Sequence, residues 1–201
     1  MADIKIKFCG LRREEDVKLA ASLGADFMGF ILSDRFKRFI APEKVGRLKE
    51  FASSAKTVGV FVDEPMDYVV SAAKTAKLDI IQLHGSEDEE YISEVKEKTG
   101  LPVIKMIKPV SLNDIMAAQH SVADLILLDS GAGGTGKKFD WSLAESLERD
   151  YILAGGLNPG NVGDAVRRLK PYAVDVSSGV EVSGIKDFEK MKAFASEVRK
   201  I

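Results

Sequence analysis

Short runs of apolar residues alternate along the chain with longer segments in which apolar positions recur every three or four residues. The short runs have the length and composition of buried strands, and the longer segments have the spacing of amphipathic helices. We predict strands at residues 4–8, 26–32, 57–62, 79–83, 102–107, 125–128, 151–154 and 173–176. The predicted helices follow them at residues 13–23, 42–51, 66–76, 87–98, 112–118, 141–147, 161–169 and 188–200.

Strict alternation of strand and helix implies a parallel sheet. Eight such units favour an α/β fold of the closed (βα)8 type, known as a TIM barrel, because an open doubly wound sheet usually has fewer strands. With 201 residues the average unit has about 25 residues, near the lower limit for this fold. We therefore predict one compact catalytic domain over residues 1–201, with two longer strand-to-helix connections at residues 33–41 and 130–140.

Composition narrows the functional classes. The formal net charge of -2 offers no electrostatic argument for binding nucleic acid or an anionic membrane. A single cysteine excludes an internal disulfide and fits a reducing compartment. No apolar run is long enough to span a bilayer, and the first residues lack the pattern of a secretion signal, so a cytoplasmic location is expected.

The active site of a (βα)8 barrel lies at the carboxyl ends of its strands. Side chains of a strand alternate between the barrel interior and the helices. In the first strand this alternation turns Lys5, Lys7 and Cys9 inward, with Cys9 at the end. Asp129 directly follows the sixth strand in the same way. Gln82 and His84 share one side of the fourth strand, and Asp175 lies inward on the eighth; these three are candidate substrate contacts.

Each of these residues also has a purely structural interpretation. A lone cysteine at a strand end is most often a small buried apolar residue. A carboxylate such as Asp129 often caps the turn after a strand, and His84 before Gly85 fits a turn residue. Lys7 and Asp175 fit an ion pair inside the barrel as well as they fit substrate contacts.

Glycines mark three of the strand ends. Gly155 and Gly156 follow the seventh strand, and Ser178 and Gly179 follow the eighth. Backbone N–H groups of these two connections commonly bind phosphate in barrels of this type, although glycines also serve simply to make tight turns. Residues 130–138 contain four glycines, which suit either a flexible connector or a loop that closes over a ligand.

Seven motifs together resemble the phosphoribosylanthranilate isomerase family, in the family's order and over nearly the whole chain. They are KFCGLR (7–12), KRFIAPE (37–43), VGVFV (58–62), IQLHG (81–85), LLDSGAGGTGKKFDW (127–141), LAGGLNPGNV (153–162) and VDVSSGVE (174–181). No single motif is decisive, but seven in order are highly specific. Because the Arg12 position varies in the family, no catalytic role is assigned to it.

The resemblance implies an Amadori rearrangement in tryptophan biosynthesis that uses neither a cofactor nor a metal. The implied substrate is N-(5-phospho-β-D-ribosyl)anthranilate, and the product is 1-(2-carboxyphenylamino)-1-deoxy-D-ribulose 5-phosphate. Matched by motif, Asp129 is the general acid, Cys9 is the general base and Arg38 holds the anthranilate carboxylate. The resemblance also implies that the phosphate is bound by the backbone N–H groups of Gly155, Gly156, Ser178 and Gly179. The family contains monomers and homodimers, and the sequence favours neither.

Other readings remain open at this point. A ribulose-phosphate epimerase would need metal ligands at the strand ends, and the chain has only two histidines, His84 and His120. An indole-glycerol-phosphate synthase would need a lysine acid, for which Lys7 and Lys105 are the candidates. A barrel that only binds a phosphorylated ligand or a protein partner would be expected to lack Cys9 or Asp129, and both are present.

Overall fold

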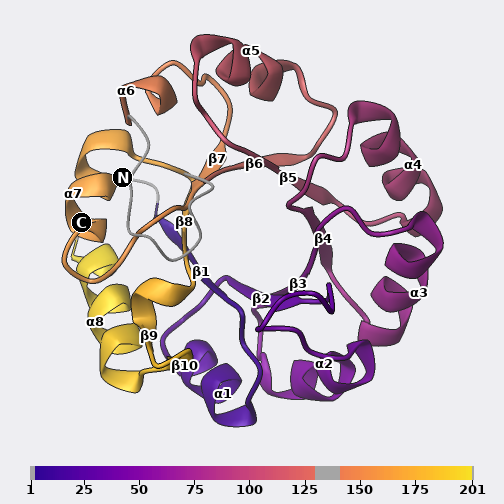
Figure 1. Cartoon of the computed structure of the whole chain (residues 1–201). Helices are drawn as coiled ribbons and strands as arrows, with labels where there is room; N and C mark the ends of the chain where they lie inside the picture. The colour runs from indigo at the N-terminus through magenta and orange to yellow at the C-terminus, as the bar shows by residue number, and fades with distance from the viewer. Residues whose placement is uncertain (1–2, 130–140, 201) are drawn as a thin grey trace. The chain divides into compact units, whose positions relative to one another are not determined.

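A computed structural model describes residues 3–129 and 141–200, and its strands form the predicted closed barrel in the order β1 to β8 (Figure 1). The barrel strands are β1 Lys5–Cys9, β2 Phe27–Ile31, β3 Lys56–Phe61, β4 Ile80–Leu83, β5 Val103–Ile107, β6 Leu125–Leu128, β7 Tyr151–Leu153 and β8 Ala173–Val176. The helices are α1 Glu14–Ser22, α2 Pro42–Leu48, α3 Met66–Ala76, α4 Glu89–Thr99, α5 Leu112–His120, α6 Trp141–Ala144, α7 Val162–Leu169 and α8 Phe188–Arg199. The prediction of a (βα)8 barrel is confirmed.

In three places the elements differ from the predicted ranges by more than one or two residues at an end. Helix α2 ends at Leu48 and continues as the 3₁₀ helix η1, Lys49–Phe51, and α6 is shorter than the predicted 141–147. The chain after β8 forms the 3₁₀ helix η2, Ser178–Val180, and a hairpin of β9 (Glu181–Val182) and β10 (Ile185–Lys186). Two-residue strands carry too little alternation for a sequence pattern to reveal them.

Neighbouring barrel strands pair in parallel, and their register aligns the strand ends. Gly29 on β2 pairs with Val58 on β3, and Val60 on β3 pairs with Gln82 on β4. The strands are buried on both faces, which is why they read as apolar runs in the sequence. Among the residues described, no helix is long and apolar enough to cross a bilayer.

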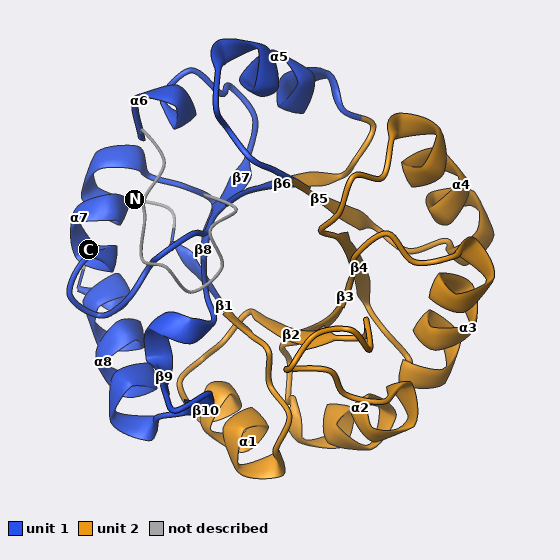
Figure 2. Ribbon diagram, in the orientation of Figure 1, with its two compact units in different colours: residues 1–7, 107–121, 126–201 blue, residues 8–106, 122–125 orange. Residues whose placement is uncertain are grey.

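Contacts between residues divide the chain into two units, coloured separately in Figure 2. Unit 1 contains residues 1–7, 107–121 and 126–201, and unit 2 contains residues 8–106 and 122–125. The single-domain organisation over residues 1–201 stays a prediction.

Unit 2 contains the same lysine–aspartate arrangement twice. Lys49 Nζ donates to the Lys77 carbonyl oxygen and to Asp79 Oδ1, while Asp79 Oδ2 accepts the backbone N–H of Thr57. Further along the chain, Lys96 Nζ donates to the Val122 carbonyl oxygen and to Asp124 Oδ1, while Asp124 Oδ2 accepts the backbone N–H of Val103. Each aspartate directly precedes a strand, so each pair joins a helical segment to the amino ends of two strands.

Candidate active site

Cys9 is the last residue of β1 and is buried, with 6% of its surface exposed. The backbone N–H groups of Gly10 and Leu11 donate to the Gly29 carbonyl oxygen at 2.9 and 3.1 Å and hold the strand end against β2. A Cβ on Gly29 would lie only 2.7 Å from the Cys9 sulfur. Gly29 was not among the predicted site residues, although a glycine inside a strand indicates a close approach.

Lys7 and Asp175 form an ion pair of 2.9 Å inside unit 1, between Lys7 Nζ and Asp175 Oδ1. The Lys7 side chain is fully buried and that of Asp175 is 9% exposed. Two charges taken out of water require each other as partners. The structural interpretation of the two residues as an interior pair therefore holds, and a substrate contact by Asp175 would be additional to it.

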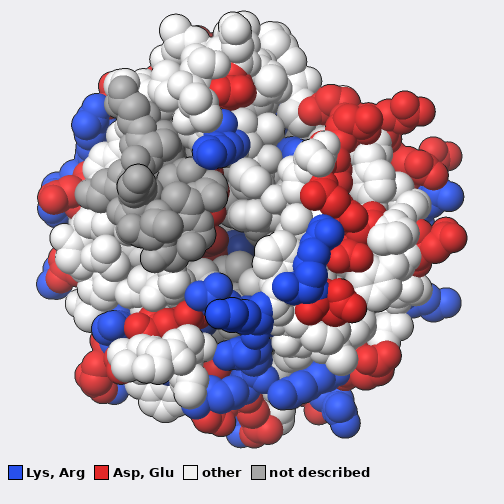
Figure 3. Space-filling model, viewed as in Figure 1, with Lys and Arg blue, Asp and Glu red and all other residues white. Residues whose placement is uncertain are grey.

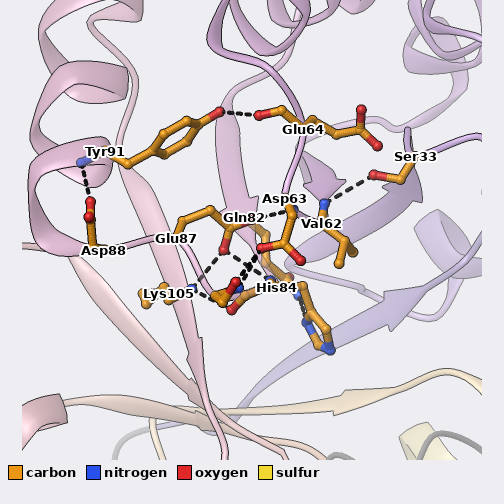
Figure 4. A network of polar contacts seen from close by, with 12 residues as sticks. Ser33, Val62, Asp63, Glu64, Gln82, His84, Glu87, Asp88, Tyr91 and Lys105 are labelled. Atoms are coloured by element: carbon orange, nitrogen blue, oxygen red, sulfur yellow. Dashed lines mark hydrogen bonds and ion pairs between the residues drawn. The ribbon is translucent and has the colours of Figure 1, made fainter.

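The end of β4 presents the polar side chains of Gln82 and His84 (Figure 4). Gln82 Nε2 lies 2.8 Å from His84 Nδ1, and Gln82 is 1% exposed. Within the described part of the chain, Gln82 Oε1 is buried without a hydrogen-bond partner. Because an unsatisfied buried carbonyl oxygen costs about 1–3 kcal/mol, this atom is suited to accept a hydrogen bond from a ligand.

The connection after β2 carries Arg38, which is half-buried. The connection is ordered by a bridge between Ile31 and Phe39 and by a hydrogen bond of 3.1 Å from Arg12 Nη1 to the Lys37 carbonyl oxygen. Arg12, which has no assigned catalytic role, thus contacts the backbone directly beside Arg38. The sequence motifs did not reveal this contact.

Figure 3 shows Lys and Arg side chains gathered on the viewed face over the segments around β2 and α2. Arg12, Arg35, Lys37 and Arg38 belong to these segments, and Arg35 and Lys37 are exposed. Such a cluster attracts anionic ligands even though the whole chain is slightly acidic. The presence of Arg38 in this basic stretch of sequence agrees with the predicted carboxylate contact but does not test it.

The connections after β7 and β8 pack against each other within unit 1. Gly155 and Gly156 have φ values of +82° and +69°, a conformation that favours glycine. The Gly156 carbonyl oxygen accepts hydrogen bonds from the side-chain amides of Asn158 and Asn161 at 3.3 and 3.0 Å. A Cβ on Gly179 would lie 1.8 Å from the Leu157 carbonyl oxygen, so only glycine permits this backbone contact.

A buried ion pair supports the second of these connections. Lys186 Nζ donates to the Ser177 carbonyl oxygen at 2.9 Å and to Glu181 Oε1 at 2.8 Å. The side chains of Lys186 and Glu181 are 1% and 5% exposed. The hairpin of β9 and β10 therefore holds Ser178 and Gly179 in place. Neither charged residue was predicted, because their pairing depends on a hairpin that the sequence pattern did not reveal.

Asp129 follows β6 and is half-buried, and its backbone N–H donates to the Ile107 carbonyl oxygen at 3.1 Å. The glycine-rich connection predicted at residues 130–138 lies outside the described residues. Cys9 ends β1 and Asp129 directly follows β6, so each lies at the carboxyl end of its own strand.

The two lysines that a synthase would require as acids are both engaged in ion pairs. Lys7 pairs with Asp175, and Lys105 Nζ lies 2.7 Å from Glu87 Oε2. Residues 3–129 and 141–200 contain no group of three or more His, Cys, Asp or Glu side chains placed to bind a metal ion.

Comparison with known proteins places this geometry in a family. Residues 6–197 match the family model described as N-(5'phosphoribosyl)anthranilate (PRA) isomerase. A curated relative from Caldanaerobacter subterraneus subsp. tengcongensis, named N-(5'-phosphoribosyl)anthranilate isomerase, is 44% identical over 202 residues, covering 98% of each chain.

Solved structures agree with the sequence comparison. The phosphoribosyl anthranilate isomerase of Thermus thermophilus superposes with a TM-score of 0.90 at 35% identity, covering 98% of this chain and 99% of that one. A phosphoribosyl anthranilate isomerase in complex with reduced 1-(o-carboxyphenylamino)-1-deoxyribulose 5-phosphate gives a TM-score of 0.87 at 35% identity, with 98% and 100% covered. The chain belongs to the N-(5'-phosphoribosyl)anthranilate isomerase family.

Proposed function

We propose that this protein converts N-(5-phospho-β-D-ribosyl)anthranilate into 1-(2-carboxyphenylamino)-1-deoxy-D-ribulose 5-phosphate, a step of tryptophan biosynthesis. The observation that carries the proposal is the family match over residues 6–197, together with the cysteine and the aspartate at the ends of β1 and β6. The substrate is a small phosphorylated molecule. Its fit is supported by the relative that binds a reduced form of the product.

The reaction requires that one proton be donated to the substrate at one atom and that another be removed from it at a second atom. Asp129 donates a proton to the furanose ring oxygen as the bond from that oxygen to C1′ breaks, which leaves a Schiff base between C1′ and the anthranilate nitrogen. Cys9, as thiolate, then removes the proton from C2′ and gives an enolamine that tautomerises to the ketone. General acid and base catalysis of this kind contributes about 10²–10⁴-fold to the rate.

The remaining predicted residues bind and orient the substrate in this proposal. Arg38 contacts the anthranilate carboxylate, since a guanidinium can donate two parallel hydrogen bonds to it. Backbone N–H groups of Gly155, Gly156, Ser178 and Gly179 bind the phosphate. Gln82, His84 and Asp175 are further substrate contacts. The packing of Gly179 on Leu157 supports the phosphate site, because it brings the two glycine-bearing connections together.

The activity is tested by rescue of a tryptophan auxotroph that lacks only this step and by turnover with purified protein. Cys9→Ala and Asp129→Asn should each lower kcat by about 10²-fold or more. Both variants should still bind the reduced product analogue, since a group that acts only in the transition state affects kcat more than KM. A purified wild type without turnover would refute the function. Near-normal kcat in either variant would refute only that residue's role.

Two further properties are proposed from the composition of the chain and from the resemblance. The protein acts in the cytoplasm, and it is a monomer or a homodimer that binds neither nucleic acid nor membrane. Light scattering during size-exclusion chromatography measures the mass directly against the 21.9 kDa of one chain.

A further inference from the structure

The segment after β4 is held by a buried ion pair that the proposed chemistry does not use (Figure 4). Lys105, on β5, donates from Nζ to the Gly85 carbonyl oxygen and to Glu87 Oε2, each at 2.7 Å. Its side chain is 6% exposed and that of Glu87 is 3% exposed. Desolvation of both charges offsets their attraction, so a buried pair like this is weak evidence of stabilisation. The effect of this ion pair on the geometry of the backbone is more informative.

Glu87 extends the contact to a third strand end. Its Oε2 accepts the backbone N–H of Gly85 at 3.0 Å, and its Oε1 accepts the backbone N–H of Asp63 at 2.8 Å. Asp63 follows β3, Gly85 follows β4 and Lys105 lies on β5. The Lys105–Glu87 pair therefore joins β5 to the segments that follow β3 and β4 in unit 2 through charge-assisted hydrogen bonds, which are stronger than neutral ones.

The backbone is strained at one residue that this pair holds, Asp63. Asp63 has a φ of +48°, which is uncommon for a residue other than glycine. Its carboxylate accepts the N–H and hydroxyl of Ser86 at 2.6 and 2.9 Å, and these bonds, the backbone one first, hold the pKa of Asp63 below its usual value. A Cβ on Gly85 would lie 2.3 Å from Asp63 Oδ1. Strain of this kind persists only where the surroundings enforce it, and it concentrates at functional sites.

The segment after β4 begins directly at the candidate substrate contacts. His84 precedes Gly85, and its backbone N–H donates to the Phe61 carbonyl oxygen at 2.8 Å. The His84 ring in turn contacts Gln82, whose Oε1 is buried without a partner in the described residues. Any movement of Gly85 therefore moves the His84 ring and the amide that contacts it.

We propose that Lys105 and Glu87 are positioning residues for the isomerase reaction, which hold His84 and Gln82 in one orientation toward the substrate. This inference rests on the proposed function. Both charged side chains are buried, so they act through the backbone of Gly85 and do not touch substrate. A displacement of about 1 Å in a positioned group can cost about 10²-fold in rate.

The chain offers an unusually clean spectroscopic test, because it has only two histidines. His84 lies beside the network, and His120 is exposed at the end of α5 and serves as an internal control. NMR of protein labelled at histidine should show the His84 ring signals shifted or split in Lys105→Met, with the His120 signals unchanged. Glu87→Gln, which keeps the side-chain volume, should produce the same change if Lys105→Met does not fold.

Kinetics supply the second measurement. Lys105→Met should lower kcat/KM about tenfold or more, and in a His84→Ala background the same substitution should have little further effect. Lys49→Met is the matched control, because Lys49 also binds one backbone carbonyl and one carboxylate, at the amino end of the strands. It should leave kcat/KM near the wild-type value.

The outcomes separate this inference from the proposed function. His84 signals unchanged in both variants, or losses in kcat/KM that multiply in the double variant, overturn the positioning role. Loss of activity in Lys105→Met without any shift of the His84 signals also overturns the positioning role. A wild type that does not turn over overturns the proposed function instead, and His84-specific shifts would still support the positioning of the ring.

Discussion

The sulfur of Cys9 occupies the space that a side chain on Gly29 would need, since a Cβ at position 29 would lie 2.7 Å from Sγ. A Cβ atom does not approach a non-bonded sulfur this closely, so a larger residue at position 29 must displace the thiol or the strand. The proposed base therefore depends on the absence of a side chain on the neighbouring strand.

Gly29→Ala should lower kcat by more than its loss of stability explains. We expect an overpacking cost of about 1–3 kcal/mol together with displacement of the thiol. Gly59→Ala is the control, because a Cβ there would lie 2.3 Å from Leu78 Cδ1, which belongs to the core. Turnover and thermal unfolding of both variants are compared. Equal loss of stability with equal loss of kcat would show that Gly29 has no specific effect on Cys9.

Gly179→Ala should raise KM, because the Leu157 carbonyl oxygen leaves no space for a methyl group. The connections after β7 and β8 must separate, and the backbone N–H groups proposed to bind phosphate move with them. Gly184→Ala in the adjacent hairpin is the control: its φ is +77°, but nothing lies within 4 Å of a Cβ there. That change should cost about 1–2 kcal/mol of stability without changing KM. A Gly179→Ala enzyme with unchanged KM would argue against the phosphate site.

Arg38→Ala should weaken substrate binding by roughly tenfold to a hundredfold, the value of a hydrogen bond to a charged group. The loss should be smaller for an aniline analogue without the carboxylate. Lys37→Ala removes a neighbouring exposed charge and should have little effect on either substrate. If Arg38→Ala weakens both substrates equally, Arg38 does not contact the carboxylate.

Asp79→Asn should reduce stability at neutral pH and have less effect in acid. Burial raises the pKa of Asp79, but hydrogen bonds from Lys49 and Thr57 outweigh it and leave the pKa below its usual value. A lowered pKa stabilises the fold above the unfolded-state pKa of about 3.9, and this contribution disappears as the pH falls through the folded-state value. Urea unfolding should show a difference of about 1–2 kcal/mol at pH 7 that narrows below about pH 4. A difference independent of pH would exclude the carboxylate charge as its source.

The sequence predicted the barrel because its signal is local. Apolar runs such as 125–128 and 173–176 match their strands residue for residue, and α3 begins and ends at the predicted positions. The family resemblance is confirmed by the match over residues 6–197. The candidate residues could be placed at strand ends without coordinates, since in a parallel barrel every strand ends at the same face. Their individual roles stay predictions.

What the tertiary structure decided is which residues meet. The chain has 29 lysines and arginines and 31 aspartates and glutamates, and no pattern in the sequence indicates that Lys105 pairs with Glu87 or Lys186 with Glu181. Lys7 and Asp175 are 168 positions apart and become partners only where the strands are brought together. Glycine is required at positions 29 and 179 because atoms distant in the chain, Cys9 Sγ and the Leu157 carbonyl oxygen, lie where a Cβ would be. The periodicity of apolar residues indicates which side of a helix or strand is buried. Which buried charges pair, and where a side chain must be absent, depends on the packed interior, because there every volume and every charge must be matched by a neighbour.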